Sequence, residues 1–156
     1  MSKIKIAIAG SSGRMGRVLL ESIAQADDLA LHAALEHPGS TLLGRDAGEL
    51  FGTPCGVKIS ADVQASLAGA DVLIDFTRPE GTLYHLDICQ QLGVNMVIGT
   101  TGFSPQQKAQ LGSAAQDIGI VFAPNMSVGV NVVFQLLETA SRVLAHGYDI
   151  EIIEAH

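Results

Sequence analysis

The stretch IKIAIAGSSGRMG, residues 4–16, decides the fold of this chain. Its first half is a short apolar run typical of a buried strand, and three glycines follow at regular spacing: Gly10, Gly13 and Gly16. This G-x-x-G-x-x-G pattern is a variant of the dinucleotide fingerprint, in which glycines allow a tight turn, a close approach to a pyrophosphate and close helix packing. The amides at the start of the following helix supply donors and partial positive charge. We therefore expect a strand, a phosphate-binding loop and a helix.

The rest of the first 127 residues continues this alternation of strands and helices. Further apolar runs predict strands at 29–35, 72–76, 96–98 and 119–123, with helices between them. Because these runs lack a polar face, they fit a parallel sheet covered on both sides. The predicted fold class is α/β, a Rossmann-type doubly wound parallel sheet. The Gly-rich stretch 38–60 has no clear periodicity, and we expect a surface excursion with one short helix at 46–50.

A different pattern begins at Val128. An apolar stripe at helical spacing predicts a helix, and residues 148–155 predict a strand; the stripe consists of Val130, Val133, Phe134, Leu137 and Leu144. A strand so rich in isoleucine needs a partner strand to pair its edge. We therefore expect a dinucleotide-binding domain over 1–127 and, over 128–156, the truncated start of a second, α+β domain.

Net charge and residue composition argue against several kinds of binding partner. The formal net charge of -7 offers no electrostatic footprint for nucleic acid or an anionic membrane surface. A transmembrane run and a signal peptide are also not evident, so we expect a cytoplasmic protein. Cys55 and Cys89 form no C-x-x-C pattern and the histidines show no ligand spacing, so we expect no metal site.

A carboxylate stands where a ribose is expected to bind. Glu36 lies about 20 residues after Gly16, the position at which Rossmann domains hold the adenosine ribose. A carboxylate there repels a 2′-phosphate and favours NAD, although a solvated glutamate at a strand end explains it too. The neighbouring His37 is ambiguous, because only a protonated imidazole pairs well with a phosphate. Arg14 offers a charge-assisted phosphate contact or is an ordinary exposed arginine.

Three loops follow predicted strands, at 75–79, 99–102 and 123–126. They should converge at the carboxyl edge of the sheet, and their small and hydroxylated residues suit ligand contact, although turn chemistry explains the same composition. Two of them precede helix starts. Ser104 has the capping-box pattern with Gln107, and Thr77 before Pro79 looks like a helix cap. We expect His85 to be a helix-surface residue.

Five blocks, in this order, resemble the bacterial 4-hydroxy-tetrahydrodipicolinate reductase (dihydrodipicolinate reductase) family: GSSGRMG, DFTRPEGT, VIGTTGF, APNMSVGVN and EIIEAH. The resemblance covers the whole chain. It implies a cytoplasmic homotetrameric oxidoreductase of lysine and diaminopimelate biosynthesis. It also implies that NADH or NADPH reduces a cyclic, unsaturated imine dicarboxylate. The alternative functions are a stand-alone dinucleotide-binding or redox-sensing module and another Rossmann dehydrogenase. The DFTRPEGT loop and the terminal EAH favour the reductase.

The resemblance also implies roles for individual residues. Thr101 would contact substrate as well as cofactor, and His156 would be the acid-base residue. The family's catalytic lysine and Gly-Thr substrate loop are not present, so we expect this chain to bind cofactor without turning substrate over. NADP-accepting members often carry arginine at the position of His37. The expected cofactor contacts are Gly10, Ser11, Ser12, Gly13, Arg14, Met15, Gly16, Glu36, His37, Gly99, Thr100, Thr101, Ala123, Pro124, Asn125 and Met126.

Overall fold

The structure is a computed structural model that describes residues 2–153 of the 156-residue chain. The chain divides into two compact units, residues 1–124 and residues 125–156, and each is described by itself.

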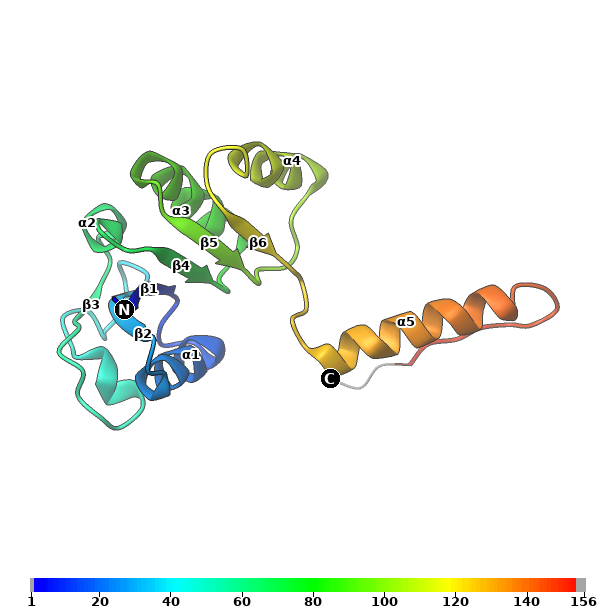
Figure 1. Cartoon of the computed structure of the whole chain (residues 1–156), viewed down its shortest axis with the longest axis horizontal. Coiled ribbons are helices and arrows are strands. Elements are labelled where there is room, and N and C mark those ends of the chain that lie inside the picture. The colour runs from blue at the N-terminus through cyan, green and yellow to red at the C-terminus, as the bar shows by residue number, and fades with distance from the viewer. Residues whose placement is uncertain (1, 154–156) are drawn as a thin grey trace. The chain divides into compact units, whose positions relative to one another are not determined.

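The first unit is built on a six-stranded parallel sheet (Figure 1). The strand order is β3-β2-β1-β4-β5-β6, so the chain winds outward in one direction from β1 and then in the other from β4. This is the doubly wound, Rossmann-type topology that the sequence predicts. Open sheets of this kind bind ligands beyond the carboxyl ends of the strands where the order reverses, here at β1 and β4. The strands are β1 Ile4–Ala9, β2 Leu29–Leu35, β3 Ile59–Ser60, β4 Val72–Asp75, β5 Asn95–Ile98 and β6 Ile120–Phe122.

Helices cover both faces of this sheet (Figure 1). Side chains alternate along β1, so Ile6 and Ile8 pack with Leu20 of α1 on one face. Ala7 and Ala9 belong to the larger core cluster on the other face, with side chains of α2, α3 and α4. Each large side chain buried in this way stabilises the fold by about 1.5–3 kcal/mol. The helices are α1 Arg14–Gln25, η1 Ala47–Leu50, α2 Val63–Leu67, α3 Pro79–Leu92 and α4 Pro105–Ala114.

Most predicted elements are confirmed. The first two strands have the predicted bounds, β4 and β5 each differ from prediction by one residue at one end, and β6 is one residue shorter at both ends. The capping box of α4 is present, because Ser104 Oγ accepts from the Gln107 amide and the Gln107 side chain accepts from the Ser104 amide. The short helix η1 is also present, and the Asp46 side chain caps it. At the start of α4, local side-chain chemistry is therefore enough to predict the helix.

Two predictions for this unit are wrong or incomplete. The N-cap of α3 is Arg78, without a side-chain cap, and Thr77 instead directs its hydroxyl to Asp75. The elements β3 and α2 are missing from the prediction, because a two-residue strand and a five-residue helix are too short to show periodicity.

The second unit contains α5, Val128–Val143, as the apolar stripe predicts. Ser127 caps it by accepting a hydrogen bond from the Val130 amide. The predicted strand at 148–155 is wrong for residues 148–153, which have no regular structure, because apolar alternation forms a strand only where a partner strand accepts its hydrogen bonds. Residues 154 and 155 lie outside the described part. The assignment of 128–156 to a larger second domain stays a prediction. Within residues 2–153, no helix is both long and apolar enough to cross a membrane.

Candidate functional site

A cleft of about 940 Å³ opens at the carboxyl ends of β1, β2 and β4. It lies where the strand order reverses, and it brings together segments that are far apart in the sequence. The glycine loop forms part of it, the residues that follow β2 another, and the end of β4 with the start of α3 the rest. Its lining includes Gly10, Ser12, Gly13, Glu36, His37, Phe76, Thr77, Arg78, Tyr84 and His85.

Each glycine of the loop has a different role. Gly10 has φ of +68, a left-handed conformation that favours glycine, and its amide bonds the Leu35 carbonyl at 3.0 Å. Gly16 is buried, and a Cβ there would overlap the Gly10 carbonyl oxygen. Gly13 is exposed to the cleft, where a Cβ would lie 3.2 Å from the same oxygen. The loop therefore turns at Gly10, is packed by α1 at Gly16 and presents bare backbone at Gly13.

The start of α1 suits an anion. Gly13 is its N-cap, and no side chain caps the helix within the described residues. The first-turn amides are therefore available to a ligand, and the helix dipole adds partial positive charge. Arg14 and Met15 are exposed beside them, Ser12 lines the cleft, and Ser11 is fully buried.

Glu36 is tied to this loop. One carboxylate oxygen, Oε1, accepts a hydrogen bond from the Ser12 amide at 2.6 Å, and Oε2 accepts one from the His37 amide at 3.3 Å. A carboxylate has about four acceptor positions, so about two remain for other donors. The position predicted for ribose binding therefore holds a carboxylate fixed at the edge of the predicted phosphate loop. That arrangement suits the paired hydroxyls of a ribose.

The ring of His37 is oriented by its own turn. Nδ1 accepts a hydrogen bond from the Gly39 amide at 3.0 Å. A neutral ring held in this way carries its hydrogen on Nε2 and can donate to a ligand without gaining a charge. This bond adds to the sequence interpretation, which considered only the protonated ring as a good phosphate partner.

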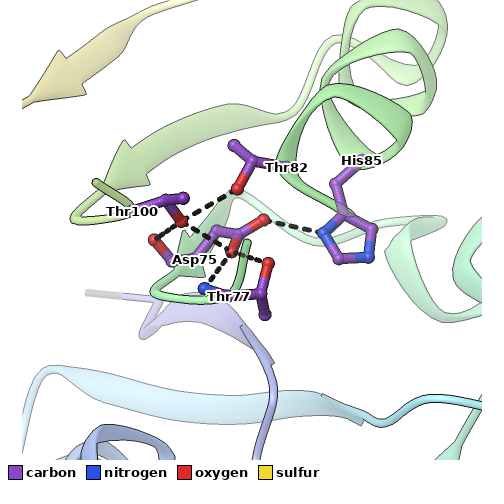
Figure 2. Close-up of polar contacts among 5 residues, drawn as sticks. All are labelled: Asp75, Thr77, Thr82, His85 and Thr100. Carbon is purple, nitrogen blue, oxygen red and sulfur yellow. Dashed lines mark hydrogen bonds and ion pairs between the residues drawn. The ribbon is translucent and has the colours of Figure 1, made fainter. Parts of the chain in front are cut away.

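A buried carboxylate lies at the end of β4 (Figure 2). Asp75 is 0% exposed, and its Oδ1 accepts from the Thr77 amide at 2.8 Å and the Thr77 hydroxyl at 2.6 Å. Its Oδ2 pairs with Nδ1 of His85 on α3 at 2.7 Å. Burial by itself raises the pKa of Asp75, but the bonds from His85 and Thr77 outweigh burial and lower it. The carboxyl group is therefore ionised at neutral pH.

The same cluster reaches the end of β5. Thr100, 2% exposed, has its hydroxyl 2.9 Å from the hydroxyl of Thr82 on α3 and 3.4 Å from Asp75 Oδ1 (Figure 2). Three segments are thus joined around one carboxylate. The expectation that His85 is a surface residue is wrong, because its side chain is only 12% exposed. An acid at a strand end and a histidine on the next helix have no fixed sequence spacing, so no motif predicts their contact.

The other predicted cofactor contacts lie in different surroundings. The side chain of Thr100 is enclosed in this cluster, whereas Thr101 is exposed. Gly99 is buried against the ring of Phe76. The lining of the cleft includes neither this loop nor residues 123–126. Of the latter, Ala123 and Pro124 end the first unit, and Asn125 and Met126 begin the second. His156 lies outside the described residues. Within residues 2–153, no three His, Cys, Asp or Glu side chains gather to hold a metal ion.

Gly99 supports the wall of the cleft. A Cβ at this position would overlap the ring of Phe76, which lines the cleft. We expect Gly99→Ala to turn that ring toward the ligand space, destabilise the chain by about 1–3 kcal/mol and weaken NADH binding about tenfold. Thermal unfolding and an NADH titration would measure both effects. The double variant Gly99→Ala, Phe76→Leu should recover most of the lost affinity, and no recovery would show that the ring is not the cause.

The family described as dihydrodipicolinate reductase, N-terminus, matches residues 4–126 of the chain. The chain belongs to this family. The match includes the glycine loop, Glu36 and the Asp75 cluster.

Curated relatives agree with this assignment. The chain is 64% identical over 156 residues to the 4-hydroxy-tetrahydrodipicolinate reductase of Nitrosomonas europaea, a match covering 100% of the chain and 58% of that protein. The enzyme of the same name from Cupriavidus necator is 61% identical over 153 residues, covering 98% of the chain and 58% of the relative. The chain therefore spans 58% of the length of these relatives.

Solved structures share the fold of this chain. A dipicolinate-bound dihydrodipicolinate reductase from Paenisporosarcina sp. TG-14 superposes with a TM-score of 0.72 at 28% identity, over 89% of this chain and 54% of that one. A dehydrogenase from Chromobacterium violaceum in complex with NADH and a UDP-sugar gives a TM-score of 0.65 at 20% identity, over 94% of this chain and 42% of that one. The second likeness shows a shared fold only.

Proposed function

We propose that this chain is the cofactor-binding part of a reductase that uses NADH or NADPH to convert 4-hydroxy-tetrahydrodipicolinate to tetrahydrodipicolinate. The observation that carries the proposal is the Ser12 to Glu36 hydrogen bond of 2.6 Å, because it joins the loop proposed to bind the pyrophosphate to the carboxylate proposed to bind the ribose. Family membership supplies the substrate class, and the relative from Paenisporosarcina was solved with the cyclic dicarboxylate dipicolinate.

The residues of the cleft fit such a cofactor. The bare backbone at Gly13 and the uncapped start of α1 would hold the pyrophosphate, and Glu36 would accept the hydroxyls of the adenosine ribose. Backbone groups of the 99–101 and 123–126 loops would line the path toward the nicotinamide, since the Thr100 hydroxyl is already engaged. When bound, the reduced nicotinamide supplies a hydride, and the protein supplies orientation and protons.

The same proposal extends to the whole protein. It places the dinucleotide domain at 1–127 and the start of a substrate-binding and assembly domain at 128–156. Thr101 would contact the substrate, and His156 would transfer the proton that accompanies reduction. We further propose a cytoplasmic homotetramer, as the resemblance to the family implies.

Titration with NADH tests the proposal on this chain. The sequence contains no tryptophan whose fluorescence could report binding, so the fluorescence of the nicotinamide itself is followed. We expect saturable binding, with NADH bound at least as tightly as NADPH at pH 8 because Glu36 repels a 2′-phosphate. Absence of saturable binding at millimolar NADH by a folded sample would overturn the proposal.

The Glu36→Gln variant tests the ribose contact. It keeps one acceptor oxygen and removes the charge, and hydrogen bonds to a charged group contribute about 1.5–3 kcal/mol. We expect NADH affinity to fall about tenfold to hundredfold, while NADPH affinity falls less because the repulsion of its 2′-phosphate also disappears. Glu21→Gln, on the exposed surface of α1, is the matched control and should change neither affinity. An equal loss for both cofactors would mean that Glu36 only shapes the loop.

A further inference from the structure

One end of the cleft is not accounted for by the phosphate and ribose contacts. This inference rests on the proposed function, in which the pyrophosphate lies on the glycine loop and a ribose lies at Glu36. The remaining wall is formed by the start of α3 and the loop before it, and it includes Phe76, Arg78, Tyr84 and His85. Aromatic and guanidinium groups of this kind suit the flat face of a purine. The purine base of the dinucleotide therefore falls in this end of the cleft.

Asp75 determines which nitrogen of His85 carries a hydrogen. The carboxylate is ionised and has no hydrogen to donate, so His85 Nδ1 must be the donor in their 2.7 Å contact. Oδ1 of Asp75 is held separately by the Thr77 amide and hydroxyl, which prevents the carboxylate from turning away (Figure 2). In the neutral ring, Nε2 is then left with its lone pair and acts as an acceptor.

This acceptor is available to a ligand. Nε2 has no hydrogen-bond partner among the described residues, and Ser11 Oγ is the one side-chain polar atom of that set that is both buried and unpartnered. Nε2 is therefore not sealed inside the protein, and His85 belongs to the lining of the cleft. In Figure 2, Nδ1 of the ring points to Asp75 and the second nitrogen points away from the cluster.

We propose that the Asp75 and His85 pair selects the purine base, with His85 Nε2 accepting a hydrogen bond from the exocyclic 6-amino group of adenine. Adenine presents a donor at position 6, whereas a 6-oxopurine presents an acceptor there. Two acceptors that face each other lose a hydrogen bond and repel. His85 is thus a specificity-determining residue, and Asp75 is a positioning residue that acts through it.

The test compares NADH with reduced nicotinamide hypoxanthine dinucleotide, in which a 6-oxo group replaces the 6-amino group. Both are titrated by nicotinamide fluorescence at pH 8.5. We expect NADH to bind about tenfold more tightly, the effect of one hydrogen bond. Equal affinities, or tighter binding of the hypoxanthine cofactor, would overturn the inference and leave the proposed function intact. Failure of both cofactors to bind would overturn the proposed function instead.

Substitution of the positioning residue provides a second test. In Asp75→Asn, the amide oxygen can still accept from Thr77, while the amide nitrogen donates to His85 Nδ1 and moves the ring hydrogen to Nε2. We expect the preference to disappear or reverse in favour of the hypoxanthine cofactor. Asp117→Asn, at an exposed carboxylate bonded to Gln90, is the control and should keep the wild-type preference. Weakening of both cofactors by the same factor would show a merely structural role and overturn the inference.

Two further measurements test the inference even if the Asp75→Asn variant does not fold. His85→Ala removes the acceptor at the cleft wall, and the ratio of the two affinities should fall to about one. Nitrogen chemical shifts of the histidine rings in the wild-type chain report the tautomer directly. A hydrogen on Nε2 of His85 at pH 8.5 would contradict the inference without any mutation.

Discussion

Replacement of Gly16 by alanine is expected to weaken NADH binding about 100-fold and to destabilise the chain by about 3 kcal/mol. The added Cβ would overlap the Gly10 carbonyl oxygen and lie 2.6 Å from the Ser11 carbonyl oxygen. Both obstacles are backbone atoms, which cannot rotate away as a side chain can. Helix α1 must therefore move off the loop, and its first-turn amides lose their position. We expect NADH affinity to fall about 100-fold, equivalent to about 2.8 kcal/mol.

Gly112→Ala is the matched control for this substitution. Gly112 lies within α4, and an added Cβ would meet no atom within 4 Å. Alanine in a helix interior is about 0.5–1 kcal/mol more favourable than glycine, so this variant should be slightly more stable and bind NADH normally. Chemical denaturation and NADH titration of both variants provide the comparison. Normal binding by the Gly16 variant would show that close packing of α1 on the loop is not required.

The sequence predicts the glycine loop because its signal is local. Gly10, Gly13 and Gly16 follow a strand directly, and steric freedom at these positions depends on the neighbouring backbone. The signal for the capping box of α4 is also local, because Ser104 and its partner Gln107 are three residues apart. Glu36 is predicted because the length of the intervening helix and strand is nearly constant in this fold. Its bond to the Ser12 amide then confirms that the carboxylate lies beside the loop.

The sequence does not predict the Asp75 cluster, and the reason is physical. The partners of Asp75 come from β4, α3 and the end of β5, and only packing brings them together. His85 looks like a surface residue in the sequence, because one polar side chain on a helix is normally solvated. The hydroxyl of Thr77 was predicted to cap α3 by accepting from a helix amide, but it instead donates a charge-assisted hydrogen bond to the buried carboxylate of Asp75. Tertiary contacts therefore override local preference at this edge of the sheet.

The predicted strand at 148–155 fails for a related reason. Alternation of apolar residues indicates which face of a strand would be buried. A strand also needs a neighbouring strand to pair with its backbone N–H and C=O groups, and the pattern does not show whether one is present. Residues 148–153 have no regular structure among the described residues. By contrast, α5 forms because a helix satisfies its own backbone and Ser127 caps its start. A helix can thus be predicted from its own sequence, whereas a strand depends on distant residues.

Asp75→Ala is expected to destabilise the chain by about 3–5 kcal/mol at pH 7, because it leaves the Thr77 amide, the Thr77 hydroxyl and His85 without their shared acceptor. Chemical denaturation would measure the loss. Asp117→Ala is the control, since that carboxylate is exposed and its removal should change the free energy of unfolding by about 0.5 kcal/mol or less.

The pH dependence of the same variant separates this account from a simple packing defect. The pKa of Asp75 is lower in the folded state, so its contribution to stability is complete above the unfolded pKa of about 3.9 and is lost as the pH falls through the folded pKa. The difference in unfolding free energy between wild type and Asp75→Ala should therefore narrow as the pH falls from about 5 toward 3. A cavity left by the missing side chain would cost the same at every pH. A difference that stays constant down to pH 3 would thus show that the ionised carboxylate, with its bonds to Thr77 and His85, is not what holds the ends of β4, β5 and α3 together.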